Sequence, residues 1–148
     1  GGAARGALVP FLEQRPVQLV IANRTPQKAA DLAAIGRATV AGSAVLACDF
    51  EALRDQGFDL VFNATSASLR GELPAIPATV FRGAALAYEL AYGKGLTPFL
   101  RLAQDAGVTT LADGVGMLVE QAAEAFAWWR GVRPATAEAI RALTVPLR

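Results

Sequence analysis

The amino-acid sequence predicts an α/β fold in which a doubly wound parallel sheet lies between two layers of helices. Short apolar runs of strand length alternate along the chain with segments whose apolar residues recur at helical spacing. The chain has 148 residues and is 53% hydrophobic, which is enough to bury the core of one domain. We therefore expect one three-layer α/β/α domain over residues 1–148.

The first half of the chain shows the order helix, strand, helix, strand. Helical spacing at residues 4–14 precedes an extended apolar run at 17–22. The next helix is expected at 25–32, where a Thr-Pro pair provides a typical helix start. A short strand at 44–47 follows it.

The same alternation continues in the second half and favours a parallel sheet. A helix with Asp49 as its N-cap leads to a buried strand at 59–63. Two more short strands are expected at 84–90 and 109–112, with a helix at 97–106 between them.

The last part of the chain is predicted to be helical and apolar. One helix covers residues 114–129 and another covers 136–143, with a break at 131–134. Trp128 and Trp129 are expected to pack the first of these helices against the sheet. A platform for stacking nucleic-acid bases is the alternative, but no basic residues interleave with the two tryptophans.

Composition excludes several classes of function. Fourteen Lys and Arg against thirteen Asp and Glu leave a net charge of +1, and no run of like charge indicates a nucleic-acid partner. The absence of histidine excludes His-based triads and His-containing metal sites from this sequence.

The same composition favours a soluble, cytoplasmic protein. The apolar stretches are too short to span a membrane, and no signal-peptide pattern opens the chain. The single cysteine, Cys48, permits no internal disulfide and is expected to be a small buried residue.

The chain opens with the glycine-rich segment Gly-Gly-Ala-Ala-Arg-Gly at residues 1–6. Its spacing is that of the second half of a G-x-G-x-x-G turn, whose glycines let the backbone approach a pyrophosphate. A buried strand normally feeds such a turn, and none precedes it here. The sequence therefore predicts a Rossmann-like fold whose first strand is missing from the chain.

Arg24 points to the cofactor. It follows the apolar run at 17–22, where such folds distinguish the two nicotinamide dinucleotides. A carboxylate at this position would accept hydrogen bonds from a free ribose 2′-hydroxyl, whereas a guanidinium beside Asn23 and Thr25 binds a 2′-phosphate. The predicted ligand is NADP(H).

Polar or small residues follow each predicted strand. Open parallel sheets bind ligands at the carboxyl ends of their strands, so residues 23–25, 63–66, 89–92 and 113–114 are candidate site segments. Ordinary turn chemistry explains 63–66 equally well, because Asn, Thr and Ser also cap the segments that follow them.

Five motifs in order resemble the cofactor domain of the shikimate dehydrogenase family. They are the glycine-rich start at 1–6, Asn-Arg-Thr-Pro-Gln-Lys at 23–28, Asn-Ala-Thr-Ser at 63–66, the segment 88–100, and Asp-Gly-Val-Gly-Met-Leu-Val-Glu-Gln-Ala-Ala at 113–123. The resemblance covers essentially the whole chain.

This resemblance implies a two-domain enzyme that reduces 3-dehydroshikimate with NADPH in aromatic amino-acid biosynthesis. The catalytic Lys–Asp pair of that family belongs to the amino-terminal domain, which has no counterpart in this sequence. We therefore expect no catalytic residue and no metal ligand in this chain, and no turnover by the chain alone.

The resemblance also implies roles for individual residues. Cofactor contacts are expected along the pyrophosphate, the adenosine phosphate, the middle of the cofactor and the nicotinamide. The residues are Gly2, Ala3, Arg5, Asn23, Arg24, Thr25, Lys28, Asn63, Thr65, Ser66, Leu90 and Gly114. For Lys28, a solvated helix face is the alternative.

Tyr92 and Gln121 are the candidate substrate-binding residues. An amide and a phenolic hydroxyl suit the hydroxylated ring of shikimate. Gln121 lies among apolar neighbours in the sequence, where an unpaired amide would be costly, so we expect it to face a polar site.

Several alternatives stay open. The family commonly reads Tyr-Asp-Met where this chain has Tyr88, Glu89 and Leu90, so an enzyme that also accepts quinate is one alternative. A non-catalytic NADP(H)-binding module is another. The cofactor domain of glutamyl-tRNA reductase shares the Asn-Arg-Thr turn but lacks the motif at 113–123. Apolar surface beside the missing strand and domain makes a homodimer possible.

Overall fold

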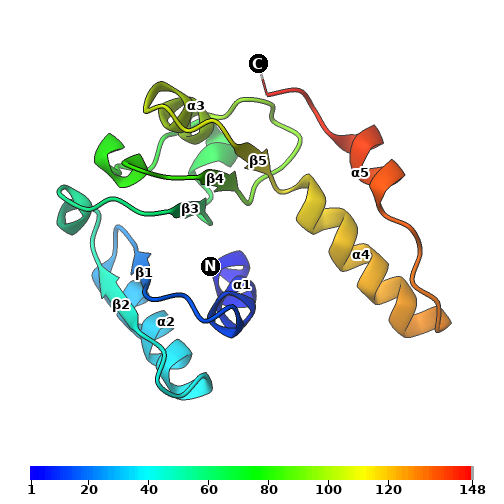
Figure 1. Ribbon diagram of the computed structural model, residues 1–148, viewed down its shortest axis with the longest axis horizontal. Coiled ribbons are helices and arrows are strands. Elements are labelled where there is room, and N and C mark those ends of the chain that lie inside the picture. Colours follow the sequence, from blue (N-terminus) through cyan, green and yellow to red (C-terminus); the bar gives the residue numbers. More distant parts are fainter. Residues whose placement is uncertain (148) are drawn as a thin grey trace.

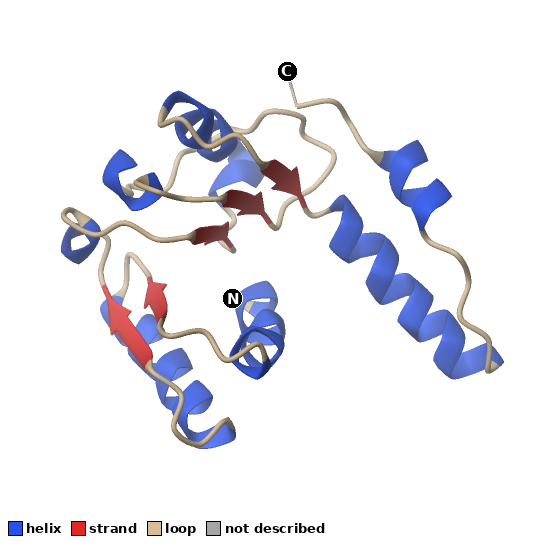
Figure 2. Ribbon diagram, viewed as in Figure 1, coloured by secondary structure: helices blue, strands red, loops and turns tan. Residues whose placement is uncertain are grey.

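The computed structural model describes residues 1–147 as an α/β structure with helices on both faces of parallel strands (Figures 1 and 2). The helices are α1 (Gly2–Glu13), α2 (Pro26–Thr39), α3 (Pro98–Asp105), α4 (Val115–Arg130) and α5 (Ala137–Leu143). The strands are β1 (Leu19–Ala22), β2 (Val45–Cys48), β3 (Leu60–Asn63), β4 (Leu86–Glu89) and β5 (Leu111–Asp113). Three 3₁₀ helices lie between strands, namely η1 (Glu51–Leu53), η2 (Ala67–Arg70) and η3 (Ala78–Phe81).

Two predicted elements differ from the structure. Helix α2 continues beyond Leu32 to Thr39, because the turns that follow remain packed. Gly36 is buried there, and a Cβ built on it would lie 3.2 Å from the Leu12 side chain. The segment after Asp49 forms the 3₁₀ helix η1 rather than an α-helix, although the Asp49 carboxylate caps it by accepting a hydrogen bond from the Ala52 amide at 2.9 Å.

The strands form two parallel sheets instead of the single sheet expected. Strand β1 pairs with β2, and the second sheet has the order β3-β4-β5. In the common doubly wound order 3-2-1-4-5-6, the first strand lies between the second and the fourth. The interruption between β1 and β3 is therefore at the place where that order has its first strand.

Alternating side chains of β1 divide the interior into two clusters. Leu19 and Ile21 face Leu8 and Leu12 of α1 and Ala33 of α2. Val20 and Ala22 face the opposite way, toward a larger cluster built on η1, η3 and α3 whose largest members are Phe81 and Phe99. This period of two places helices on both faces of the strands, which confirms the three-layer α/β/α arrangement.

Helix α1 spans the interruption on one face. Its Phe11 ring lies 4.5 Å from the Phe62 ring of β3, centroid to centroid, and Phe62 lies 5.7 Å from Tyr88 of β4. Helix α1 also contacts α2, which packs on β1 and β2. Aromatic packing by α1 thus connects the two sheets.

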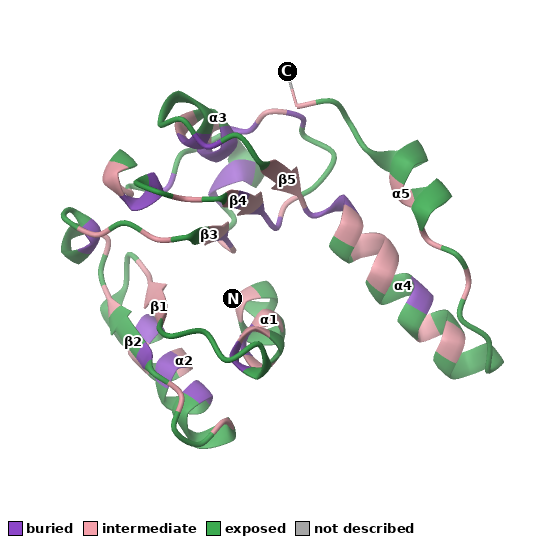
Figure 3. Cartoon of the chain, viewed as in Figure 1, coloured by how far each residue is buried: buried purple, intermediate pink, exposed green. Residues whose placement is uncertain are grey.

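Helix α4 leaves the end of β5 and runs away from the strands, accompanied by α5 (Figure 1). Its surface is largely green and pink in Figure 3, and Trp128 and Trp129 are 89% and 76% exposed. The expectation that these tryptophans pack against the sheet was wrong, because the part of α4 that carries them has no sheet beside it. No helix in the described part of the chain is both long and apolar enough to cross a bilayer.

Candidate cofactor site

A cavity of about 1320 Å³ begins in the interruption between β1 and β3 and extends over the carboxyl ends of β1, β3 and β4. Its apolar part is lined by β1 and β3 and lies where the common order has a strand. Its polar part lies over the strand ends, where open α/β sheets bind ligands. This polar part is therefore the candidate functional site.

The rim at the end of β1 carries two cations. The Asn23 carboxamide oxygen accepts a hydrogen bond from the Thr25 amide at 2.9 Å, which shapes the turn between β1 and α2. This turn leaves Arg24 exposed on the rim, and Lys28 of the first turn of α2 lines the same cavity. Two exposed cations at one end of the cavity suit a phosphate group.

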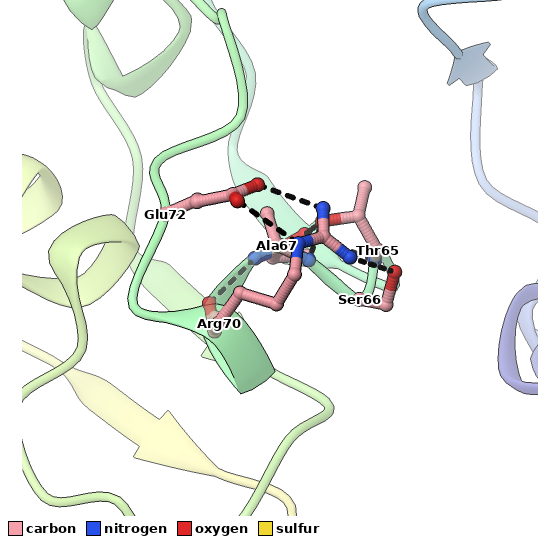
Figure 4. Close-up of polar contacts among 7 residues, drawn as sticks. Thr65, Ser66, Ala67, Arg70 and Glu72 are labelled. Atoms are coloured by element: carbon pink, nitrogen blue, oxygen red, sulfur yellow. Dashed lines mark hydrogen bonds and ion pairs between the residues drawn. The ribbon is translucent and has the colours of Figure 1, made fainter.

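Arg70 and Glu72 follow β3 and line the same cavity. The Arg70 guanidinium donates two hydrogen bonds to the Glu72 carboxylate, at 2.9 and 2.7 Å, and a longer one to the Ser66 hydroxyl at 3.4 Å (Figure 4). The hydrogen bond and charge of Arg70 lower the pKa of Glu72, and the charge of Arg24 adds a smaller effect. The charge of Arg24, which follows β1, therefore acts on the Glu72 carboxylate, which lies on the β3 side of the interruption.

The turn after β3 is built around a buried amide. Asn63 is 3% exposed, and its carboxamide oxygen accepts hydrogen bonds from the amide and the hydroxyl of Thr65 at 3.0 and 2.8 Å. The Thr65 hydroxyl in turn accepts from the Ala67 amide at 3.3 Å. Asn63 thus shapes the turn, while Thr65 and the exposed Ser66 are presented to the cavity.

The first turn of α1 and the junction between β5 and α4 also approach the site. Gly1, Gly2 and Ala3 line the cavity at the amino terminus of α1, where free backbone amides favour an anion. Gly114 is buried, and its amide donates to the Ala91 carbonyl at 3.0 Å. This contact holds the start of α4 against the segment after β4.

Most of the residues that the sequence analysis proposed line this one cavity. They are Gly2, Ala3, Asn23, Arg24, Thr25, Lys28, Asn63, Thr65, Ser66, Leu90 and Tyr92. Arg5 and Gly114 do not line it, and neither does Gln121.

Gln121 is exposed on α4. Its apolar neighbours in the sequence therefore do not force the Gln121 amide toward a polar site, since the side chain is open to water. A substrate role for Gln121 stays a prediction that rests on the family resemblance.

Sequence reasoning missed Arg70, Glu72 and Lys94 on the cavity lining. Arg70 and Glu72 stand two residues apart near the irregular end of η2, and Lys94 lies in a turn. Charged residues outside helices and strands are ordinarily interpreted as exposed surface residues. No sequence signal therefore distinguished these three from the other exposed charges.

Cys48, at the end of β2, was expected to be buried and is partly buried against the larger cluster. Burial raises the pKa of its thiol, and the charge of Asp49 raises it further. Because the thiolate is the reactive form, we expect a disulfide reagent at pH 8 to modify Cys48 more slowly than free cysteine.

The matched variant D49N keeps the oxygen that caps η1 but removes the charge, and we expect it to speed the reaction by about twofold. Reaction of the wild-type chain as fast as free cysteine would contradict this assignment.

Known proteins match both the sequence and the structure. The family model described as shikimate 5′-dehydrogenase C-terminal domain matches residues 114–144. Shikimate dehydrogenase (NADP(+)) from Nitrosospira multiformis is 60% identical over 136 residues, which is 92% of this chain and 48% of that protein. The protein of the same name from Aromatoleum aromaticum is 52% identical over 97% of this chain and 51% of its own length.

Two solved structures extend the comparison. An Ael1 enzyme from Pseudomonas putida is 62% identical with a TM-score of 0.92, and the match covers 100% of this chain and 53% of that one. A shikimate dehydrogenase in complex with NADP⁺ is 27% identical with a TM-score of 0.68, over 85% of this chain and 45% of that one. The chain spans about half the length of the relatives it matches, and over nearly its whole length it is similar to shikimate dehydrogenases.

Proposed function

We propose that this chain is the cofactor-binding part of an NADP-dependent shikimate dehydrogenase, which reduces 3-dehydroshikimate to shikimate. The observation that carries the proposal is the cavity at the strand ends, with Arg24 and Lys28 at one extremity and the turn of Thr65 and Ser66 farther along. Relatives named shikimate dehydrogenase (NADP(+)) support the choice of cofactor and reaction.

The residues present fit a dinucleotide phosphate. Arg24 and Lys28 would hold the 2′-phosphate, and the amides at the start of α1 would hold the pyrophosphate. Thr65 and Ser66 would bind the middle of the cofactor, and Leu90 would wall the nicotinamide end, where Gly114 approaches by its backbone. When bound, the cofactor supplies the hydride, so the task of this chain is placement.

The remaining parts of the site are proposed to lie outside these residues. The proton-transferring groups would come from a second domain, and Tyr92 and Gln121 would reach the substrate from this part. A cytoplasmic location belongs to the same proposal. The single cysteine of this chain cannot form an internal disulfide, which fits a reducing compartment. A homodimer stays a prediction.

A broader substrate range is the second candidate. A 5-ketofructose reductase of Gluconobacter matches 97% of this chain with a TM-score of 0.72 and 27% identity, so a related fold serves a protein named for another substrate. The departure from the family pattern at Glu89 and Leu90 keeps quinate as an alternative substrate. Shikimate and quinate compared as substrates of the full-length enzyme would separate the two.

Calorimetric titration of the chain with NADPH and with NADH tests the proposed function. We expect micromolar binding of NADPH and binding of NADH weaker by about tenfold or more, since a charge-assisted hydrogen bond contributes roughly 1.5–3 kcal/mol. Equal affinities for NADPH and NADH would overturn the assignment of Arg24 and Lys28 to the 2′-phosphate. No detectable heat with either cofactor would overturn the proposal that this chain binds the cofactor.

A further inference from the structure

Glu89 is a fully buried carboxylate at the last residue of β4, with 0% of its surface exposed. None of the ion pairs found among residues 1–147 includes it. A buried charge is costly unless hydrogen bonds and local dipoles compensate it. The structure shows four donors that do so.

Three of the donors are side chains that converge on the same oxygen. Glu89 Oε2 accepts from Ser68 Oγ at 2.5 Å, from Asn63 Nδ2 at 2.9 Å and from Thr97 Oγ1 at 3.2 Å. The other oxygen, Oε1, accepts from the Ala91 amide at 3.4 Å. These donors come from the end of β3, from η2, from the start of α3 and from the segment after β4.

The amino terminus of α3 adds a favourable dipole. Thr97 is the N-cap of this helix, and its hydroxyl accepts from the Leu100 amide at 3.2 Å while it donates to Glu89. A carboxylate beside a helix N-terminus is stabilised by the helix dipole. This arrangement lets the charge stay buried without a cation.

The carboxylate fixes the orientation of Asn63. Because Nδ2 points to Glu89 and to Ser68, Oδ1 is left to accept both hydrogen bonds from Thr65. A reversed amide would place two donors against Thr65 and an oxygen against the carboxylate. Glu89 therefore sets the turn that presents Thr65 and Ser66 to the cavity, although Glu89 itself does not line it.

We propose that Glu89 is a positioning residue for cofactor binding, which acts through Asn63 and Ser68 on the turn at 63–66. The proposal rests on the proposed function, because the turn is assigned there to the middle of the cofactor. In this proposal the charge of Glu89, and not the size of its side chain, determines the conformation of the turn.

Three variants of the 148-residue chain test it. E89Q keeps the size but turns one acceptor into a donor that faces other donors, and we expect the Kd for NADPH to rise about tenfold. The Kd for NADH should rise by the same factor, since Arg24 is untouched. E89D keeps the charge and should restore affinity to within about threefold of wild type. S68A removes one donor without touching the carboxylate and should weaken both cofactors by about threefold.

A matched control and a ligand-free readout complete the design. D105N neutralises an exposed carboxylate at the far end of α3 and should bind both cofactors like wild type. In NMR spectra recorded without cofactor, the amide chemical shifts of Thr65 and Ser66 should differ from wild type in E89Q and lie near the wild-type values in E89D. These spectra test the turn even if the wild-type chain binds no dinucleotide, so failure of the proposed function is told apart from failure of this inference.

Two results would overturn the proposal. One is folded E89Q with wild-type affinity and unmoved amides at 65 and 66. The other is E89D as impaired as E89Q, which would assign the effect to packing instead of charge. If E89Q does not fold, the S68A result decides, and wild-type affinity in S68A would reject the proposal.

Discussion

Replacement of Arg24 by alanine is expected to weaken NADPH binding by about ten- to a hundredfold and to leave NADH binding nearly unchanged. The range follows from the roughly 1.5–3 kcal/mol that a hydrogen bond to a charged group contributes. Arg24 lies exposed on the cavity rim after β1, and only NADPH carries a 2′-phosphate for it to bind. Calorimetry or protein-fluorescence titration of both cofactors measures the change.

The control for R24A is R101A, which removes an exposed guanidinium from α3, away from the cavity lining. We expect R101A to bind both cofactors like wild type. An equal loss of NADPH and NADH affinity in R24A would place Arg24 against a group that the two cofactors share, such as the pyrophosphate, and would refute its role in selectivity.

The second large effect is expected from G114A. The backbone conformation of Gly114 suits any residue, with φ of −75°, so the problem is space. A Cβ at this position would lie 2.2 Å from the Leu90 carbonyl oxygen and 2.9 Å from the Leu90 carbonyl carbon, which are backbone atoms. The start of α4 must then move away from the end of β4, and the hydrogen bond from the Gly114 amide to Ala91 is strained or lost.

We expect G114A to lower the free energy of unfolding by about 2–4 kcal/mol, from overpacking together with a lost hydrogen bond. G116A is the matched control in the same helix, because nothing lies within 4 Å of its added Cβ. Gly116 lies in the first turn of α4 and its φ is not positive, so alanine there should instead raise stability by about 0.4–1 kcal/mol, chiefly by restricting the unfolded chain. Urea unfolding of both variants gives the comparison, and two changes of the same sign would contradict the close approach at Gly114.

The order of helices and strands could be predicted because local periodicity records which face of each element is buried. The apolar run at 17–22 predicted β1, and the Thr-Pro pairs predicted the starts of α2 and α3. The end of α2 was harder, since Gly36 reads as a helix breaker and is retained by its packing against Leu12. Such packing joins residues far apart in sequence, which periodicity does not record.

Burial on α4 could not be predicted for the same reason. Gln121 was expected to face a polar site and the two tryptophans to pack against the sheet, but all three are exposed and no sheet lies beside the part of the helix that carries the tryptophans. Apolar composition shows that a face is suited to burial, and it does not show which surface covers it.

The candidate site was predictable where topology alone decides it. Parallel strands bring their carboxyl ends to one edge, so Arg24, Thr65 and Tyr92 were expected near one another, and all three line the cavity. The network of Glu89 was not predictable, because its donors come from four separate segments whose convergence depends on the three-dimensional fold.

An experimental structure of the chain with NADP⁺ tests the central claim most directly, since it locates the 2′-phosphate. We expect this phosphate within hydrogen-bonding distance of the Arg24 guanidinium, with the pyrophosphate at the start of α1 and the middle of the cofactor beside Thr65 and Ser66. A dinucleotide bound with its adenosine end away from Arg24, or away from the carboxyl ends of β1, β3 and β4, would contradict it.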